Sequence, residues 1–237
     1  MNEFSLNGYR KLLRTFQSKD YKFLKFQNVL RLVIKYPFIL LRHDIDFSLH
    51  GALEMARVEK KEGVLSTFFL FLRSPFYNVL SSRNCEIIHE INSFGHDVAL
   101  HIDLNFYKEG YISGLKNEID ILQTFFPFAN IEIVSLHRPG GLVKARSIEL
   151  SKTNHTYERT FTDDIEYISD SDSIWKYGYP TNSHAFRKNK PIQLLTHPLW
   201  WTQNGNRPLE KIQKYIDFNR GLLIESFRDS LVFDIEL

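Results

Sequence analysis

The sequence has few cysteines, which cross-link small secreted proteins, and few of the glycines and prolines that are typical of linkers between domains. Its 237 residues include a single cysteine, Cys85, so an intramolecular disulfide framework is excluded. Glycine and proline number only 11 and 8, and no Pro/Gly/Ser-rich linker, low-complexity tract or internal repeat interrupts the chain. We therefore expect a single domain over residues 1–237, held together by a hydrophobic core.

Long hydrophobic runs and an excess of one charge are also lacking. The most apolar stretch, Val64–Leu72, is far shorter than a membrane span and is followed by Arg73. The first residues, with Glu3 near the start, do not have the order of a secretory leader, so we expect a cytoplasmic protein. The 30 Lys and Arg nearly balance the 28 Asp and Glu and are scattered, which argues against nucleic acid and favours a small or neutral partner.

Short apolar segments alternate with helix-like ones along the chain. The apolar segments are too continuously hydrophobic for half-exposed strands and are typical of buried parallel strands. They are residues 38–41, 66–72, 98–102, 131–136, 167–169 and 192–195. Between them, Ser48 can cap a helix that ends at Gly63, and further helices are expected over 85–91 and 115–125. The alternation predicts an α/β fold.

Nearly every apolar segment is followed at once by residues that can bind a metal or transfer a proton. These are His43–Asp46, His101–Asp103, His137–Arg138, Asp170 and His197. In parallel α/β folds the carboxyl ends of the strands meet at one rim, and in barrels this rim holds the active site. We therefore expect these residues to lie together. The terminal residues 1–36 and 208–237 have helix-like apolar patterns and no site candidates, and we assign them to packing.

Three of these residues are candidate metal ligands. Asp44 and Asp46 would point to the same face of a strand, about 6.5–7 Å apart, although such a pair alone is more typical of a loop that caps a helix. His101 and His137 each end an apolar run, where a lone histidine more often bonds to a carbonyl. Taken together, Asp46 and the two imidazoles suit Zn²⁺ or another late divalent metal with an open position for water.

Other residues are candidates for catalysis or substrate binding. Pro198 keeps His197 extended, and an imidazole at that position can donate a proton near neutral pH. Arg138 can hold Asp44 ionised through a charge-assisted hydrogen bond. Large aromatic side chains form either core or a wall on which a sugar stacks, with core as the default for each alone. They are Tyr77, Trp175, Trp200 and Trp201.

Five short fragments follow one another along residues 38–201. They are Arg42–Asp46, Gly95–His101, His137–Pro139, Tyr167–Ser171 and Thr196–Pro198. Their order and spacing resemble the polysaccharide deacetylases, the NodB-homology group of carbohydrate esterases. The resemblance implies a distorted (β/α) barrel of about seven parallel strands and a mononuclear metal site that hydrolyses N- or O-acetyl groups on sugars. It further implies that Asp44 is the catalytic base, and that Asp46 and His101 bind the metal.

The same resemblance implies roles for three more residues. Arg138 is similar to the arginine that orients the base, Asp170 to the acid that pairs with this arginine, and His197 to the general acid. Our candidate contacts to the substrate are Tyr77, Asn78, Trp175 and Trp201.

The sequence also departs from the family pattern. Ile45 separates two acids that are adjacent in the family, and Asn105 stands where the family has a second metal histidine. We expect His137 to complete the site, and a weak contribution from Asn105 is the alternative. Together with Tyr77-Asn78 and Leu199–Trp201, these departures are similar to a bacterial subgroup associated with surface-polysaccharide synthesis.

Three hypotheses for function follow. The first is a metal-dependent hydrolase that removes an acetyl group from a sugar or sugar-linked small molecule, with one divalent ion, Zn²⁺ first and Ni²⁺, Co²⁺ or Mn²⁺ as alternatives. The second is a catalytically silent carbohydrate-binding or scaffold protein, which Asn105 favours. The third is a metal-free glycoside hydrolase that uses Asp44 with Asp103 or Asp170 as its carboxylate pair.

Overall fold

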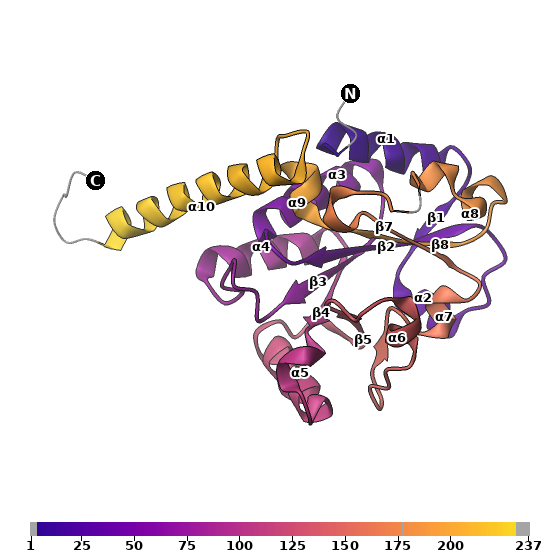
Figure 1. Cartoon of the computed structure of the whole chain (residues 1–237), viewed down its shortest axis with the longest axis horizontal. Coiled ribbons are helices and arrows are strands. Elements are labelled where there is room, and N and C mark those ends of the chain that lie inside the picture. The colour runs from indigo at the N-terminus through magenta and orange to yellow at the C-terminus, as the bar shows by residue number, and fades with distance from the viewer. Residues whose placement is uncertain (1–3, 177, 231–237) are drawn as a thin grey trace.

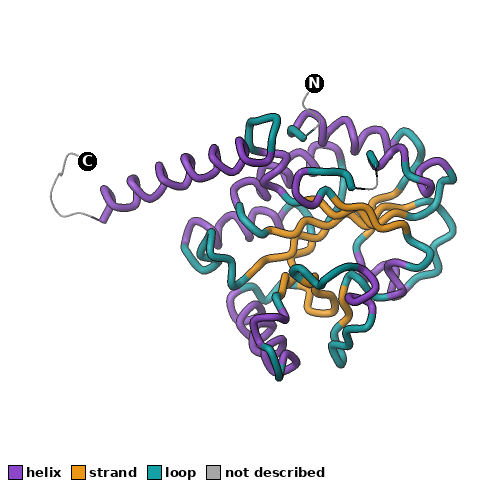
Figure 2. Tube along the Cα trace, viewed as in Figure 1, coloured by secondary structure: helices purple, strands orange, loops and turns teal. Residues whose placement is uncertain are grey.

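The structure is a computed structural model that describes residues 4–176 and 178–230. It is built around one sheet, drawn in orange in Figure 2, in which every pair of neighbouring strands is parallel. The strands are β1 (Lys22–Leu24), β2 (Phe38–Ile45), β3 (Thr67–Phe71), β4 (Asp97–Ile102), β5 (Asn130–Leu136), β6 (Asn154–His155), β7 (Glu166–Ser169) and β8 (Ile192–Thr196). All six strands expected from the apolar segments are present.

The order of the strands makes an incomplete barrel. The continuous path is β6-β5-β4-β3-β2-β8-β7, and β1 pairs with the beginning of β2 outside this path. Within the described ranges no pairing joins β6 to β7, so the seven strands curl into a half-barrel that does not close. This confirms the predicted distorted (β/α) barrel of about seven parallel strands. The two strands that the sequence did not indicate, β1 and β6, have only three and two residues.

Helices surround the sheet (Figure 1). They are α1 (Leu6–Gln17), α2 (Phe26–Arg31), α3 (Leu49–Glu62), α4 (Ser82–Ser93), α5 (Tyr111–Phe125), α6 (Leu142–Arg146), α7 (Arg159–Thr162), α8 (His184–Arg187), α9 (Pro198–Thr202) and α10 (Pro208–Ser230). The expected ends of α3 are confirmed: the Ser48 hydroxyl accepts a hydrogen bond from the amide of Gly51 at 3.0 Å, and Gly63 ends the helix with a φ of 66°. Ser48, which caps α3, is therefore only two residues after Asp46, so the start of this helix lies next to the end of β2.

The two faces of β2 pack against different parts of the protein. On one face Leu40 joins a buried cluster that includes Phe69 of β3, Phe26 of α2 and Phe161 of α7. On the other face, the neighbours of Leu40 in the chain pack with residues of α1 and α9. Because side chains alternate along a strand, the residues beyond Leu40 on its own face lie above this apolar cluster, at the carboxyl end of the sheet.

The amino- and carboxyl-terminal parts differ in how they pack. Helix α1 buries four large side chains, as expected for packing. The beginning of α10 is anchored by the buried Lys211, whose Nζ donates to the carbonyls of Phe4, Trp200 and Gln203 at 2.6–2.8 Å. Farther along, α10 extends away from the body (Figure 1), and Leu223 remains 60% exposed.

The assignment of this carboxyl-terminal region to packing is therefore wrong for the distal part of α10, where Phe227 is also 61% exposed. Residues 1–3 and 231–237, for which packing was also expected, lie outside the described residues. Within the described part of the chain, no helix has both the length and the hydropathy of a membrane span.

Candidate metal centre and acid–base groups

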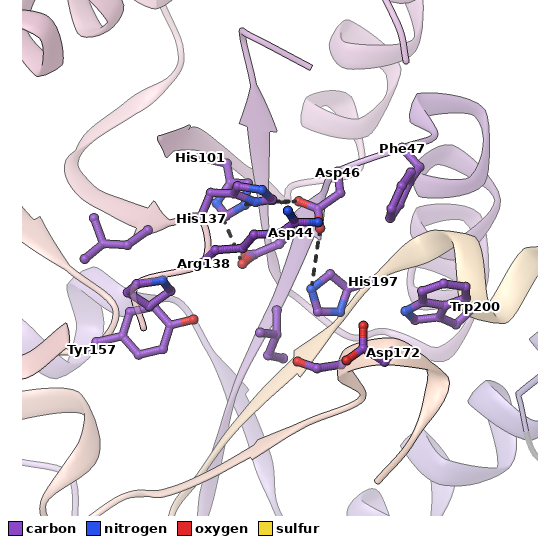
Figure 3. Close-up of a pocket in the computed structure, with 14 residues that line it drawn as sticks. Asp44, Asp46, Phe47, His101, His137, Arg138, Tyr157, Asp172, His197 and Trp200 are labelled. Atoms are coloured by element: carbon purple, nitrogen blue, oxygen red, sulfur yellow. Dashed lines mark hydrogen bonds and ion pairs between the residues drawn. The ribbon is translucent and has the colours of Figure 1, made fainter. Parts of the chain in front are cut away.

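The rim at the carboxyl ends of the strands carries a pocket of about 270 Å³ (Figure 3). It brings together residues that the sequence places on four separate strand ends. The predicted residues that line it are Asp44, Asp46, His101, His137, Arg138 and His197. The convergence expected from a parallel sheet is thus present in the structure.

Asp46, His101 and His137 form a compact triangle of possible ligand atoms. Asp46 Oδ1 lies 3.1 Å from His101 Nε2 and 3.4 Å from His137 Nδ1, and the two nitrogens are 3.1 Å apart. Ligand atoms about 2.0–2.1 Å from a tetrahedral Zn²⁺ lie about 3.3–3.4 Å from one another. The three atoms are therefore spaced as three ligands of one tetrahedral zinc ion would be.

The surroundings of the triangle also suit a cation. Asp46 Oδ1 is buried and has no hydrogen-bond partner among the described residues, an arrangement that is costly without a cation. Burial alone would raise the pKa of Asp46, but its contacts with His101 and His137 hold it well below the usual range. The carboxylate is therefore ionised. These residues fit a divalent metal.

His101 is oriented by a residue behind it. Its Nδ1 lies 3.2 Å from the carbonyl oxygen of Ser135, to which it can donate, and 3.1 Å from the hydroxyl of the same residue. With the proton on Nδ1, the lone pair of Nε2 would be free to coordinate a metal ion held beside Asp46. Such a bond to the far nitrogen is the usual means by which proteins fix a metal-binding histidine.

Asn105, the alternative third ligand, lies elsewhere. It is an exposed residue in a short 3₁₀ turn, η1 (Leu104–Tyr107), and its side-chain amide donates to Asp103 Oδ1 at 3.0 Å. Asp103 also accepts from the backbone amide of Asn105, so its carboxylate closes this turn. The structure therefore places His137, and not Asn105, beside Asp46.

Asp44 is held by an arginine that the sequence analysis did not assign. Arg42 Nη2 donates to Asp44 Oδ2 at 2.9 Å, and the Ser135 hydroxyl donates to the same oxygen at 2.8 Å. Burial alone would raise the pKa of Asp44, but the charge of Arg42 lowers it below its ordinary value. The expected bond between Arg138 and Asp44 is not formed, because Arg42 occupies that side of the carboxylate.

The environment of Arg42 explains how a charge can lie inside the sheet. The residue is fully buried, and its guanidinium donates to the hydroxyls of Thr156 and Tyr157 and to Gln193 Oε1. The ring of Tyr157 also lies 4.7 Å from the guanidinium carbon. A signal for this role was present in the sequence, since Arg42 is two residues before Asp44 and shares its face of the strand.

Asp170 was expected to pair with Arg138, and the structure pairs it with His197 instead. His197 Nδ1 lies 2.6 Å from Asp170 Oδ1, and Trp201 Nε1 donates to Asp170 Oδ2 at 2.7 Å. Burial would lower the pKa of His197, but the charge of Asp170 outweighs it and raises the pKa to about 9. His197 Nε2 faces the pocket, 3.9 Å from Asp46 Oδ2.

The structure does not place the proposed substrate contacts on the pocket. The Tyr77 hydroxyl donates to the carbonyl of Ile45 at 2.6 Å, and the exposed Asn78 accepts from the amide of Leu80 in a turn. Trp175 stacks on Phe4 within a hydrophobic cluster. Trp201 is buried, and its indole N–H donates a hydrogen bond to Asp170. Three of these four residues are aromatic and were expected to form a wall on which a sugar stacks. Of the aromatic candidates, Trp200 does line the pocket, and lining residues that were not predicted include Phe47, Tyr157 and Asp172 (Figure 3).

Comparison with known proteins finds likeness only among solved structures. No protein-family model matches the chain, and no curated protein matches it by sequence. The chitin deacetylase of the fungus Colletotrichum lindemuthianum is similar with 16% identity and a TM-score of 0.45, over 80% of this chain and 84% of that one.

Two bacterial structures give similar values. A family 4 carbohydrate esterase from Bacillus anthracis has 15% identity and a TM-score of 0.44, over 77% of this chain and 76% of that one. A peptidoglycan deacetylase from Bdellovibrio bacteriovorus has 14% identity and a TM-score of 0.42, over 81% of this chain and 52% of that one.

The metal triangle predicts which residues retain an ion. Asp46→Ala, His101→Ala and His137→Ala should each lose bound zinc after dialysis, because two remaining ligands make a poor site. Asn105→Ala is the matched control and should keep the ion, since its amide lies in a separate turn. Elemental analysis of the dialysed proteins measures this. Loss of zinc from Asn105→Ala, with retention in His137→Ala, would contradict the assignment.

The placement of the two arginines predicts different effects on stability. Arg42→Ala leaves Asp44 as an unpaired charge inside the protein and should lower the free energy of unfolding by about 3–5 kcal/mol. Arg138→Ala removes an exposed side chain and should change it by no more than about 0.5 kcal/mol. Urea unfolding of both variants provides the measurement. The opposite ranking would show that Arg138 is the partner of Asp44 in solution.

Proposed function

We propose that the protein is a metal-dependent hydrolase that removes an acetyl group from an N- or O-acetylated sugar. The observation that carries this proposal is the state of Asp44 beside the metal triangle. Its Oδ2 is held by Arg42 and Ser135, whereas Oδ1 is buried and has no partner among the residues that the structure describes. A carboxylate fixed by one oxygen, with the other free at a pocket, is arranged to take a proton from water.

Asp46, His101 and His137 would hold the divalent ion, for which Zn²⁺ is the first choice and Ni²⁺, Co²⁺ or Mn²⁺ are alternatives. When bound, such an ion lowers the pKa of water and polarises the acetyl carbonyl. The neighbouring Arg42 keeps Asp44 ionised, because its charge lowers the pKa of the carboxyl group. Asp44 is therefore available as the general base at neutral pH.

His197 supplies the proton for the leaving group. Its Nδ1 is engaged with Asp170, so in the protonated ring the Nε2 proton points into the pocket. With a pKa raised to about 9, chiefly by Asp170 acting against burial, the imidazole is protonated at neutral pH. It can protonate the sugar nitrogen or oxygen as the bond from that atom to the acetyl carbon breaks, which releases the amine or hydroxyl.

The pocket suits one sugar unit better than a long chain. Its volume of about 270 Å³ is just below the range of about 300–1,000 Å³ for small-molecule sites. Its walls combine the polar groups with the rings of Phe47 and Trp200. Such rings can stack on a sugar face while carboxylates and imidazoles bind its hydroxyls. The motif resemblance supports a role in making a surface polysaccharide, with the sugar or a sugar-linked precursor as substrate.

Acetate release tests the proposed reaction. The zinc-loaded protein should release acetate from an acetylated sugar in a panel of monosaccharides and nucleotide sugars, and a chelator should abolish this. Asp44→Asn should lower kcat by about 10²–10⁴-fold because the base is lost. Asp103→Asn is the control and should retain activity, since Asp103 closes a turn.

Two results would count against this function. Sugar-chain cleavage that persists in chelator and is lost in Asp103→Asn would indicate a glycoside hydrolase. Sugar binding without acetate release, with any of the four metals, would indicate a silent carbohydrate-binding protein.

The contact between Asp170 and His197 predicts a pH dependence. Activity that needs protonated His197 is present at neutral pH and is lost as pH rises through a pKa of about 9. Asp170→Asn removes the charge that raises this pKa, so the alkaline limb of kcat should move down by about one pH unit or more. Asp172→Asn is the control. Asp172 is an exposed residue at the rim of the pocket, so this substitution should leave the alkaline limb of kcat unchanged. An unmoved limb in Asp170→Asn would exclude His197 as the acid.

A further inference from the structure

Arg138 is an exposed cation at the pocket that has no partner in the described part of the chain. It lines the pocket together with the metal triangle (Figure 3). Among the described residues, no carboxylate lies within ion-pair distance of its guanidinium and no acceptor lies within hydrogen-bond distance. The sequence motif predicted that Arg138 pairs with Asp44, but Arg42 forms that ion pair.

The charges inside the site are balanced without Arg138. Asp44 is paired with Arg42, and Asp170 is paired with His197. Asp46 faces two imidazoles and suits a cation. The other charged side chain of the mouth is Asp172, an exposed residue on the segment after β7. The guanidinium of Arg138 is therefore available to a ligand that enters the pocket.

The backbone at Arg138 is held in an unfavourable conformation. Its φ is 45°, in the left-handed region that residues with a side chain rarely adopt, and the residue that follows is Pro139. Gly140 and Gly141 continue with φ values of 80° and 96°, which glycine adopts without strain. Strain of this kind persists where the surrounding structure enforces it, and it is concentrated at binding sites. Here it turns the chain directly after His137 and places Arg138 at the pocket.

A second cation, Lys144, lies six residues farther along the chain, on α6. The side chain of Lys144 folds over Gly140, where its Nζ is 3.4 Å from the position that a Cβ on Gly140 would take. Lys144 is exposed and, like Arg138, forms no ion pair with any described residue. Lys144 is not among the residues that line the pocket, so of these two cations Arg138 alone presents its positive charge there. It favours an anionic group, since guanidinium binds carboxylate and phosphate through two parallel hydrogen bonds.

We propose that Arg138 binds an anionic group, a carboxylate or a phosphate, on the acetylated sugar that enters this pocket. The inference rests on the proposed deacetylase function and specifies its substrate class as an acidic sugar. Arg138 is then a specificity-determining residue and not the orienting partner of the base.

Direct binding to the zinc-loaded protein tests this proposal. Calorimetry would compare N-acetylglucosamine with its 1-phosphate, its 6-phosphate and its uronic acid, which separates phosphate from carboxylate. At least one anionic sugar should bind about tenfold or more tightly than the neutral one, as expected for hydrogen bonds between charged groups. The preference should weaken with added salt.

Two matched substitutions assign the preference to Arg138. Arg138→Gln should reduce the ratio of anionic to neutral affinity about tenfold. Arg138→Lys should keep part of this ratio, because lysine carries the charge but lacks the planar guanidinium that forms two parallel hydrogen bonds. Arg220→Gln, which removes an exposed arginine on the remote α10, should leave the ratio unchanged. Equal binding of all four sugars, binding of none, or a preference that survives Arg138→Gln would overturn the proposal.

Acetate release from the same sugars separates this proposal from the function on which it rests. Anionic sugars that bind through Arg138 but release no acetate would refute the deacetylase alone. Acetate released from neutral and anionic sugars with the same kcat/KM would refute the role of Arg138 alone.

Discussion

The candidate site depends on one constraint, the alternation of side chains along β2. Because every second residue of a strand shares a face, Arg42 and Asp44 lie above the apolar cluster, and Asp46 follows at the rim. The residue between the first two, His43, points to the opposite face, where it contacts Glu59 at 2.7 Å and Thr196 at 2.6 Å. A slip of one residue would exchange these two sets and turn the side chain of Asp44 away from the pocket. The contacts of His43 with α3 and β8 therefore also fix the register of the site.

The buried ion pair between Arg42 and Asp44 determines what the pocket can do. Two charges inside a protein are costly unless their remaining groups are hydrogen-bonded, and here Ser135, Tyr157 and Gln193 provide those bonds. The cluster is rigid because its members come from β2, β5, β8 and the segment after β6. It leaves one oxygen of Asp44 without a partner among the described residues. The same oxygen that is expensive to bury is the one that the proposed reaction uses.

Much of this arrangement could be predicted from the sequence, and the failures have a common cause. Continuous apolar segments indicated six buried strands, and the residues that follow them converge because parallel strands end at one rim. The partners of Asp44 and Asp170 were not predictable from motif order, because either of two arginines can satisfy the same carboxylate and only packing selects Arg42. Aromatic residues were also uninformative, since Trp175 and Trp200 look alike in sequence and only the second reaches the pocket.

The central claim is that one divalent ion binds Asp46, His101 and His137 together. Crystals grown with zinc and measured on both sides of the zinc absorption edge provide the most direct test. The account predicts one strong anomalous peak within about 2.0–2.2 Å of Asp46 Oδ1, His101 Nε2 and His137 Nδ1. A zinc-saturated crystal with no peak at this triangle, or with the peak bound to other residues, would contradict it.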